Sequence, residues 1–351
     1  MQRTMALETV SRIGETVVLK GWIHTRRDMG KLAFLDLRDR SGLVQVVLVP
    51  NELDEASREA MKELRSEYCL EIQGLVQKRG EKQINTNVPT GTVEVLAKSI
   101  KILNPAKALP FEIEDTSKVN EELRLKYRYL DLRSPRMLRN ILLRDAVAQS
   151  FRNFLHRHGF IEIETPYLTK GTPEGSREFI VPSRLHPGQF YVLPQSPQQF
   201  KQLMMVGGVE RYFQMARCFR DEDQRGDRQP EHTQFDLEMS FVEREDVMEL
   251  FEQLLIELVK TVTPHKRIQQ VPFPRLTYKE AMEKYGTDKP DLRTDKNDPD
   301  LLAFEWVVDF PFFEKTDEGG WTYSHNPFSA AKPEHRQWLL EKKNIDRKSV
   351  V

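Results

Sequence analysis

The stretch "RCFRDEDQRGDRQPEHTQFDLEMSF" (Arg217–Phe241) decides the fold of the second half of this chain. Two runs with the period-two alternation of β-strands flank a segment, Asp221–Pro230, in which nearly every residue is charged or polar. This segment is much longer than a tight hairpin turn requires. We therefore predict a β-hairpin with a long loop, and the pattern alone leaves open whether the loop is merely solvated or binds a ligand.

The strands of this hairpin are predicted to separate polar from apolar side chains, because successive residues of a strand point to opposite faces. On the first strand, one face carries Tyr212, Gln214, Ala216, Cys218 and Arg220. On the second strand, the apolar face carries Phe235, Leu237, Met239 and Phe241, and the other carries Gln234, Asp236 and Glu238. We expect the polar face of the second strand to be open.

The bulk composition excludes several classes of protein. The chain has 351 residues, with 53 lysines and arginines against 54 acidic residues and a net charge of -1, which argues against nucleic-acid binding by bulk charge alone. Its two cysteines, Cys69 and Cys218, are flanked by apolar residues and are expected to be reduced, packed thiols that form no metal cluster. No apolar run approaches the roughly 20 residues that span a bilayer, so we expect a cytoplasmic protein.

The first part of the chain, residues 1–105, is predicted to be a small closed β-barrel. Residues 16–49 alternate as short strands around a turn at Ser41-Gly42, and residues 68–80 and 91–103 repeat the pattern after a helical stretch at 51–66. This count favours the five-stranded OB-fold.

The chain then changes character. The prolines that follow residue 104 mark a linker or hinge, which we place at residues 106–136. Residues 137–160 have apolar side chains at helical spacing, with Gly159 as the predicted C-cap. Helices are also expected over 197–208 and 244–262, among hairpin-connected strands. We therefore predict an α+β fold class, with an antiparallel-sheet domain over residues 137–351.

The opening hairpin resembles motif 2 of the class II aminoacyl-tRNA synthetases. The shared pattern is Phe-Arg-Asp-Glu, a polar loop, Arg-Gln-Pro-Glu and then Thr-Gln-Phe-Asp-Leu-Glu, and it is most similar to the version in the aspartyl members. Residues 195–205, "QSPQQFKQLMM", resemble the family's aspartate-recognition helix. Residues 171–179, "GTPEGSREF", resemble the loop that closes over the amino acid.

Three further segments are similar to the aspartate, asparagine and lysine subgroup of this family, and the resemblance covers residues 1 to about 330. Residues 127–137, "YRYLDLRSPRM", resemble its hinge, and residues 21–47 resemble its anticodon-binding barrel. The helix that ends in "FIEIETPYL", with Pro166, resembles motif 1, which builds the family's dimer interface. The resemblance thus implies a homodimer of chains that each pair an OB-fold barrel with a class II catalytic domain.

The resemblance also implies a two-step reaction. The α-carboxylate of L-aspartate attacks the α-phosphorus of ATP, with Mg²⁺ present, to give aspartyl-adenylate and pyrophosphate. The terminal ribose of tRNA-Asp then takes the aspartyl group. Positioning and charge stabilisation are expected to dominate such a mechanism.

The nucleotide site implied by the family lies on both arms of the hairpin. Arg220 is the expected catalytic residue, because its planar charge suits both the α-phosphate and the attacking carboxylate. His232 stands where related sequences usually carry phenylalanine, and its planar ring retains the capacity to stack on adenine. The expected ATP-binding residues are Arg220, Asp221, Glu222, Gln229 and His232.

The aspartate site implied by the family needs a cation for the side-chain carboxylate and anions for the ammonium group. Lys201, one helical turn after Gln198, is the expected cation, and Asp236 and Glu174 are the expected anions. The expected aspartate-binding residues are Glu174, Gln195, Ser196, Gln198, Lys201, Arg220, Asp236 and His325.

In the barrel, Phe34 is the expected stacking platform for an anticodon base. Asp36 shares its predicted strand face, which indicates that this face is exposed. The expected anticodon-binding residues are Arg26, Arg27, Phe34, Gln45, Arg79 and Glu94, although basic residues on a barrel are also compatible with simple solvation. No residue is assigned to a metal.

The chain departs from the family at two places. No large insertion domain separates "GTDKPDLR" (286–293) from the strand that begins near residue 302. Nothing after residue 328 matches the family's Mg²⁺-binding acidic residues or its motif 3 arginine, so the chain resembles a truncated product and is expected to be catalytically weak or inactive. Two alternatives stay open: a sister enzyme for asparagine or lysine, and a non-catalytic tRNA-binding protein built from synthetase parts.

Overall fold

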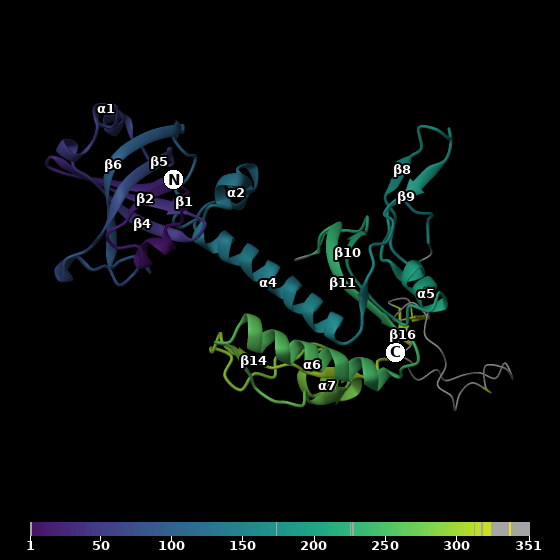
Figure 1. Ribbon diagram of the computed structural model, residues 1–351. Helices are drawn as coiled ribbons and strands as arrows, with labels where there is room; N and C mark the ends of the chain where they lie inside the picture. The colour runs from purple at the N-terminus through teal and green to yellow at the C-terminus, as the bar shows by residue number, and fades with distance from the viewer. Residues whose placement is uncertain are drawn as a thin grey trace. The chain divides into compact units, whose positions relative to one another are not determined.

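The computed structural model describes residues 2–172, 174–224, 226, 228–311, 313–316, 319–323 and 337. The chain divides into two compact units, Met1–Val119 and Asn120–Val351 (Figure 1). The first half of the predicted linker therefore groups with the barrel, and the second half groups with the unit that follows. No helix within the described ranges is long and apolar enough to cross a membrane.

The first unit is a barrel that closes through one long strand. The order of its strands is β1-β2-β3-β4-β6-β5, and β2 pairs with both β3 and β5. The predicted OB-fold architecture is confirmed, with β1 as a short additional strand. The bounds are β1 Arg3–Thr4, β2 Thr16–Met29, β3 Leu32–Asp39, β4 Gly42–Leu48, β5 Cys69–Lys78 and β6 Val93–Asn104, with α1 at Glu55–Glu63 and 3-10 helices at Leu7–Ser11, Pro50–Glu52 and Glu81–Gln83.

Alternation along β3 builds the core of this barrel. Ala33, Leu35 and Leu37 are at most 2% exposed, while Phe34 and Asp36 between them face outward and are only partly buried. The turn into β4 lies one residue earlier than predicted, because Gly42 already pairs with Asp39 as the first residue of the strand.

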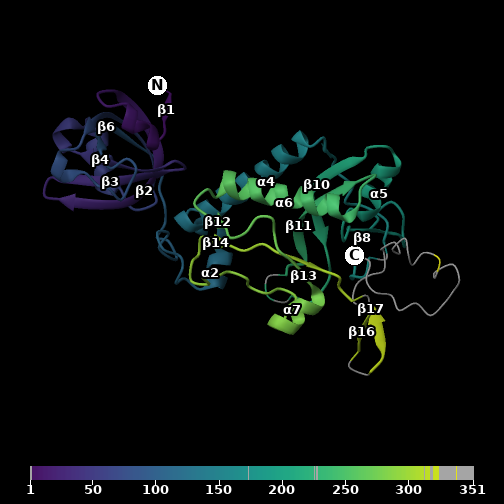
Figure 2. The same cartoon turned by 90° about the horizontal axis from the view of Figure 1, so that it is seen from below.

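The second unit (Figure 2) begins with a helical approach to the long helix α4 (Pro135–Arg157). Ser134 caps α4 by accepting from the backbone N–H of Met137, and Gly159, with a φ of 78°, follows its last turn as predicted. The other helices are α2 Glu121–Lys126, α3 Arg128–Asp131, α5 Gln198–Val206, α6 Arg244–Val262 and α7 Tyr278–Tyr285.

The predicted hairpin is formed by β10 (Arg211–Phe219) and β11 (Glu231–Met239), which pair antiparallel from Arg211↔Met239 to Phe219↔Glu231. Its apolar face packs in a core shared with α4 and α6, formed by Phe154, Leu155, Phe160, Phe213, Leu250 and Leu254 with Phe235, Leu237 and Met239 at the edge. The placement of Phe241 on this face is wrong, since β11 ends first and Phe241 is 94% exposed.

Short strands surround the hairpin. β7 pairs parallel to β10, and β12–β14 and β13–β15 are also parallel, which the expectation of hairpin-connected strands did not include. The remaining strands are β7 Ile161–Glu162, β8 Ile180–Pro182, β9 Phe190–Val192, β12 Arg267–Ile268, β13 Arg275–Thr277, β14 Leu301–Leu302, β15 Trp306–Val308, β16 Phe313–Lys315 and β17 Trp321–Tyr323.

Candidate functional site

The polar face of the β10–β11 hairpin holds a buried ammonium between two carboxylates. Helix α5 packs against both strands and brings Lys201 to this face. The Lys201 Nζ donates to Asp236 Oδ1 at 2.9 Å and lies 3.1 Å from Glu238 Oε2. The Lys201 and Asp236 side chains are only 12% and 11% exposed, so the pair is largely shielded from water.

Electrostatics keeps Lys201 charged in this cluster. Burial by itself lowers the pKa of Lys201, but the adjacent Asp236 and Glu238 carboxylates outweigh it and the pKa is raised above its usual value. Burial raises the pKa of Asp236, although Lys201 opposes the shift. A cluster of one ammonium and two carboxylates is able to bind a ligand that carries both a negative and a positive group, as an amino acid does.

The segment before α5 is joined to the loop over residues 171–179. Glu174 Oε2 accepts from Ser196 Oγ at 2.6 Å, and the Oε1 of Gln195, which is 2% exposed, accepts from the backbone N–H of Ser176 at 2.9 Å. Gln198 opens α5, and its backbone N–H donates to Ser196 Oγ at 3.3 Å. The structure thus joins Glu174, Gln195, Ser196 and Gln198 through the 171–179 loop and the start of α5, and Glu174 and Ser196 line a cavity of about 110 Å³.

Arg220 stands at the mouth of the long polar loop. Its backbone N–H donates to the carbonyl of Pro230 at 2.8 Å, which holds the two ends of the loop together. The Arg220 Nε is buried and has no hydrogen-bond partner among the described residues. A buried guanidinium N–H without an acceptor suits an anion such as a phosphate or a carboxylate.

The other residues of the predicted nucleotide site contact residues other than Arg220. Glu222 accepts from the hydroxyl of Ser176, and Asp221 N–H donates to the Arg177 carbonyl at 3.0 Å, so the polar loop contacts the 171–179 loop. His232 is half-buried on β11, opposite Cys218. Burial raises the pKa of the Cys218 thiol to about 11, which makes it a poor nucleophile.

His325 and Mg²⁺ are the other expected groups of this site. His325 lies outside the described residues. Within the described ranges, no group of three or more His, Cys, Asp or Glu side chains is arranged to hold a metal ion. Gln229 is exposed in the polar loop.

The outer face of the barrel gathers four of the six predicted anticodon residues. Arg27 Nη2 donates to Asp36 Oδ1 at 3.1 Å and to Gln45 Oε1 at 3.2 Å, and Gln45 Nε2 donates to Glu94 Oε2 at 2.9 Å. Phe34 lies beside this chain of contacts, paired across the sheet with Arg27. An aromatic ring bordered by amide, carboxylate and guanidinium groups is able to stack on a base and to bond its edge.

The other two predicted anticodon residues have different surroundings. Arg26 Nη1 donates to the carbonyls of Met61 and Leu64 at 2.9 and 2.8 Å, where α1 ends, and does not join the network around Arg27. Neighbouring residues on a strand point to opposite faces, which explains this separation. Arg79 is 7% exposed and donates to the Val93 carbonyl at 2.9 Å, with its pKa lowered by burial.

Several members of these networks were not among the predicted site residues. Glu238 shares a strand face with Asp236, and Asp36 shares one with Phe34, so period-two spacing was a signal for both. The Ser176 hydroxyl donates to Glu222, and Glu178 accepts from Gln195 Nε2. Both residues lie on an irregular loop, where no periodicity in the sequence predicts which side chains will be in contact.

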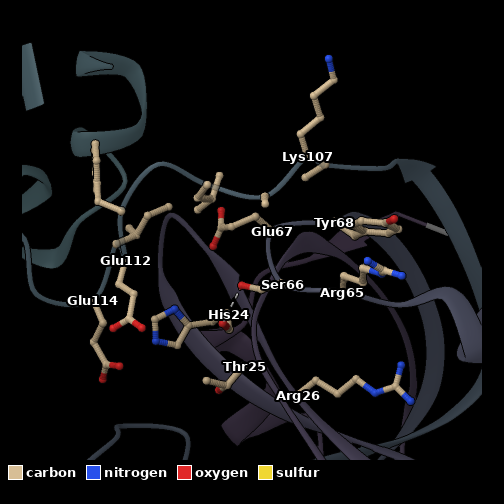
Figure 3. A pocket seen from close by; sticks show the side chains of 15 residues that line it. His24, Thr25, Arg26, Arg65, Ser66, Glu67, Tyr68, Lys107, Glu112 and Glu114 are labelled. Carbon is tan, nitrogen blue, oxygen red and sulfur yellow. Dashed lines mark hydrogen bonds between the residues drawn. The ribbon is translucent and has the colours of Figure 1, made fainter. Parts of the chain in front are cut away.

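A larger cavity, of about 1000 Å³, lies in the first unit between β2, residues 65–68 and residues 106–114 (Figure 3). His24 lies on the same side of it as the carboxylates of Glu112 and Glu114. Arg65 and Lys107 add positive charge to its lining. Because positive and negative side chains both line the cavity, its charge does not indicate which class of ligand it would bind.

Comparison with known families matches both units. Residues 17–103 match the OB-fold nucleic acid binding domain of the tRNA anti-codon family, and residues 120–349 match the tRNA synthetases class II (D, K and N).

Curated relatives carry names from the same family. The chain is 54% identical over 296 residues to the aspartate–tRNA ligase of Geobacillus kaustophilus, which covers 84% of this chain and 50% of that one. It is 50% identical over 313 residues to the aspartate–tRNA(Asp/Asn) ligase of Bacillus cereus, covering 89% of this chain and 52% of that one. The chain thus spans about half the length of these relatives.

Solved structures share the fold. Asparaginyl-tRNA synthetase from Pyrococcus horikoshii, complexed with asparaginyl-adenylate, matches with a TM-score of 0.73 at 24% identity, covering 91% of this chain and 78% of that one. A putative aspartyl-tRNA synthetase from Leishmania major matches with a TM-score of 0.66 at 27% identity, covering 75% and 53%. This chain belongs to the class II tRNA synthetases of the D, K and N group, with an OB-fold domain ahead of the synthetase domain.

Proposed function

We propose that this chain carries the amino-acid site and the anticodon-binding barrel of an aspartate–tRNA ligase. The observation that carries the proposal is Lys201, a largely buried cation held by the two carboxylates of Asp236 and Glu238. The names of the relatives at 50–54% identity support aspartate as the amino acid. A cytoplasmic location belongs to the same proposal.

In this mechanism Lys201 exchanges one of its carboxylate partners for the side-chain carboxylate of L-aspartate. Asp236 and Glu174 then take up the ammonium group, and Gln195, Ser196 and Gln198 line the pocket. This exchange conserves ion pairs in a largely dry site, so it selects a carboxylate over the neutral amide of asparagine.

Arg220 acts on the reacting atoms. An oxygen of the α-carboxylate forms a bond to the α-phosphorus of ATP while the bond to pyrophosphate breaks. The guanidinium binds both the attacking oxygen and the phosphate, and its buried Nε supplies one of the two donors that such a fork needs. Glu222, Gln229 and His232 are proposed to contact the adenine, with Asp221 beside them.

The barrel is proposed to read tRNA-Asp. Phe34 stacks on an anticodon base, and Gln45, Glu94 and Arg27 bond base edges and phosphates, with Arg79 supporting Glu94 from 3.9 Å. Arg26 is proposed to support α1 instead of contacting RNA.

The chain is also proposed to form a homodimer through α4 and the region of Pro166. Ile141, Leu142 and Leu143 on α4 are 45–56% exposed, which is unusual for three consecutive large apolar side chains on a helix.

The decisive experiment is ATP–pyrophosphate exchange by the 351-residue chain with aspartate, asparagine or lysine as the amino acid. Weak exchange that depends on aspartate, and is abolished by Lys201→Met but not by the exposed-lysine control Lys260→Met, supports the proposal. Robust exchange would contradict the expectation that this chain is weak or inactive. Exchange that depends on asparagine or lysine instead would show that this amino acid, and not aspartate, is the substrate.

A second measurement separates catalysis from tRNA binding. Filter binding with tRNA-Asp and tRNA-Asn, alongside the exchange assay, is expected to show binding that depends on Phe34. Binding without any exchange would reduce the function of this chain to tRNA recognition.

A further inference from the structure

A buried carboxamide lies beneath the Lys201–Asp236 pair, and none of the proposed chemistry uses it. Gln214, on β10, is 3% exposed and stands directly opposite Asp236 in the strand register. Opposed residues of an antiparallel pair share a face, with Cβ atoms about 4.5–5.5 Å apart. The two side chains are therefore neighbours on the polar face of the hairpin.

The oxygen of this carboxamide already accepts two hydrogen bonds. Gln214 Oε1 accepts from the hydroxyl of Tyr212 at 2.7 Å and from Thr165 Oγ1 at 3.0 Å. A carbonyl oxygen has two lone pairs, so both are used and the orientation of the amide is fixed. The Nε2 group must then point to the remaining side of the carboxamide.

Two buried, unpartnered polar atoms belong to this opposed pair of residues. Gln214 Nε2 and Asp236 Oδ2 are both buried, and neither has a hydrogen-bond partner among the described residues. One is a donor and the other an acceptor. Leaving a buried donor or acceptor without a partner destabilises the protein, and more so when the group is charged. Because both atoms are sealed from solvent, a bound amino acid does not reach them directly.

We propose that Gln214 is a positioning residue for Asp236: its Nε2 donates to Asp236 Oδ2 through one bridging water, and so turns Oδ1 toward Lys201. Asp236 is then held from both sides, by Lys201 at Oδ1 and by Gln214 at Oδ2. A donor to the charged form also counteracts the burial that raises the pKa of Asp236. The other titratable groups that face Asp236 are Lys201 on α5, Glu238 on β11, and Tyr212 and Cys218 on β10. The Tyr212 hydroxyl is also within hydrogen-bonding reach of the Asp236 carboxylate.

The test measures the pKa of Asp236 directly, by ¹³C NMR of the full chain labelled at the aspartate side-chain carboxyls, with Asp236→Asn for assignment. Gln214→Met keeps the volume and removes the donor, and is expected to raise this pKa by about one unit, a tenfold change in proton affinity. Gln253→Met, on the exposed face of α6, is the matched control and is expected to leave it unchanged. A pKa that stays the same in a folded Gln214→Met protein overturns the proposal.

A second variant covers the case in which Gln214→Met does not fold. Gln214→Glu retains the acceptor oxygens but sets two carboxyls against each other, so the pair is expected to titrate in two steps, one of them at a higher pH than Asp236 in the original chain. A single, unshifted step also overturns the proposal.

The consequence for the amino acid rests on the proposed function, whereas the NMR readout does not. In calorimetric titration, Gln214→Met is expected to weaken aspartate binding about tenfold below the new pKa, with little change well above it. A shifted pKa without aspartate binding in any variant would refute the proposed function and leave the role of Gln214 intact.

Discussion

The polar networks of the barrel and of the hairpin use the same residue types but differ in their access to water. On the barrel, the side chains of Arg27 and Asp36 are 55% and 23% exposed, whereas those of Lys201 and Asp236 are 12% and 11% exposed. Exposed pairs contribute about 0–1 kcal/mol, and buried pairs are costly to break. The barrel network is thus suited to exchange its partners for RNA at little cost, whereas the hairpin network is suited to exchange a carboxylate only for another carboxylate.

The strongest test of this difference in burial is a substitution of Lys201, where we expect the largest effect. Lys201→Met leaves Asp236 and Glu238 buried without a counter-charge, so it should lower the free energy of unfolding by about 3–5 kcal/mol in urea denaturation. Lys260→Met, on the exposed face of α6, should change it by no more than about 0.5 kcal/mol. Equal losses of unfolding free energy for the two variants would show that the burial of the hairpin network does not determine its contribution to stability.

The next largest effect is expected at Phe34, and on binding instead of stability. Phe34→Leu removes the aromatic face and keeps an apolar side chain, so tRNA affinity should fall by the equivalent of about 1–3 kcal/mol in filter binding. Phe34→Tyr retains the ring and should bind nearly as well as the original. Similar losses for both variants would argue against stacking.

A smaller effect follows from pH. Because the folded-state pKa of Lys201 is raised, its contribution to stability is fully present below the pKa of the unfolded chain and is lost as the pH rises through the folded value. The difference in unfolding free energy between the original chain and Lys201→Met should therefore shrink above about pH 10.4. A difference that stays constant to pH 12 would contradict the assignment of a charged Lys201.

The smallest effect is expected for the exposed arginine of the barrel. Arg27→Met removes a partly solvated pair and should change the unfolding free energy by less than about 1 kcal/mol, while the salt dependence of tRNA binding should become shallower. A large loss of stability would mean that the barrel face is structural rather than a binding surface.

Sequence patterns predicted most of the elements that carry these networks. Helix α6 has the predicted bounds, Arg244–Val262, because its apolar spacing and acidic first turn are local signals. The alternation in β3 correctly placed Phe34 and Asp36 on an outward face. The misplacement of Phe241 came from continuing the same alternation past the end of β11, where the backbone turns.

The sequence by itself determined the two-part organisation, the hairpin with its polar face, and the family to which the chain belongs. Only the tertiary structure showed that Arg26 turns to α1 instead of joining Arg27, that Glu238 is the second partner of Lys201, and that Gln214 lies beneath Asp236. The physical reason is range. Periodicity and capping act within a few residues, whereas the partner of a buried charge is set by how a helix packs on a sheet.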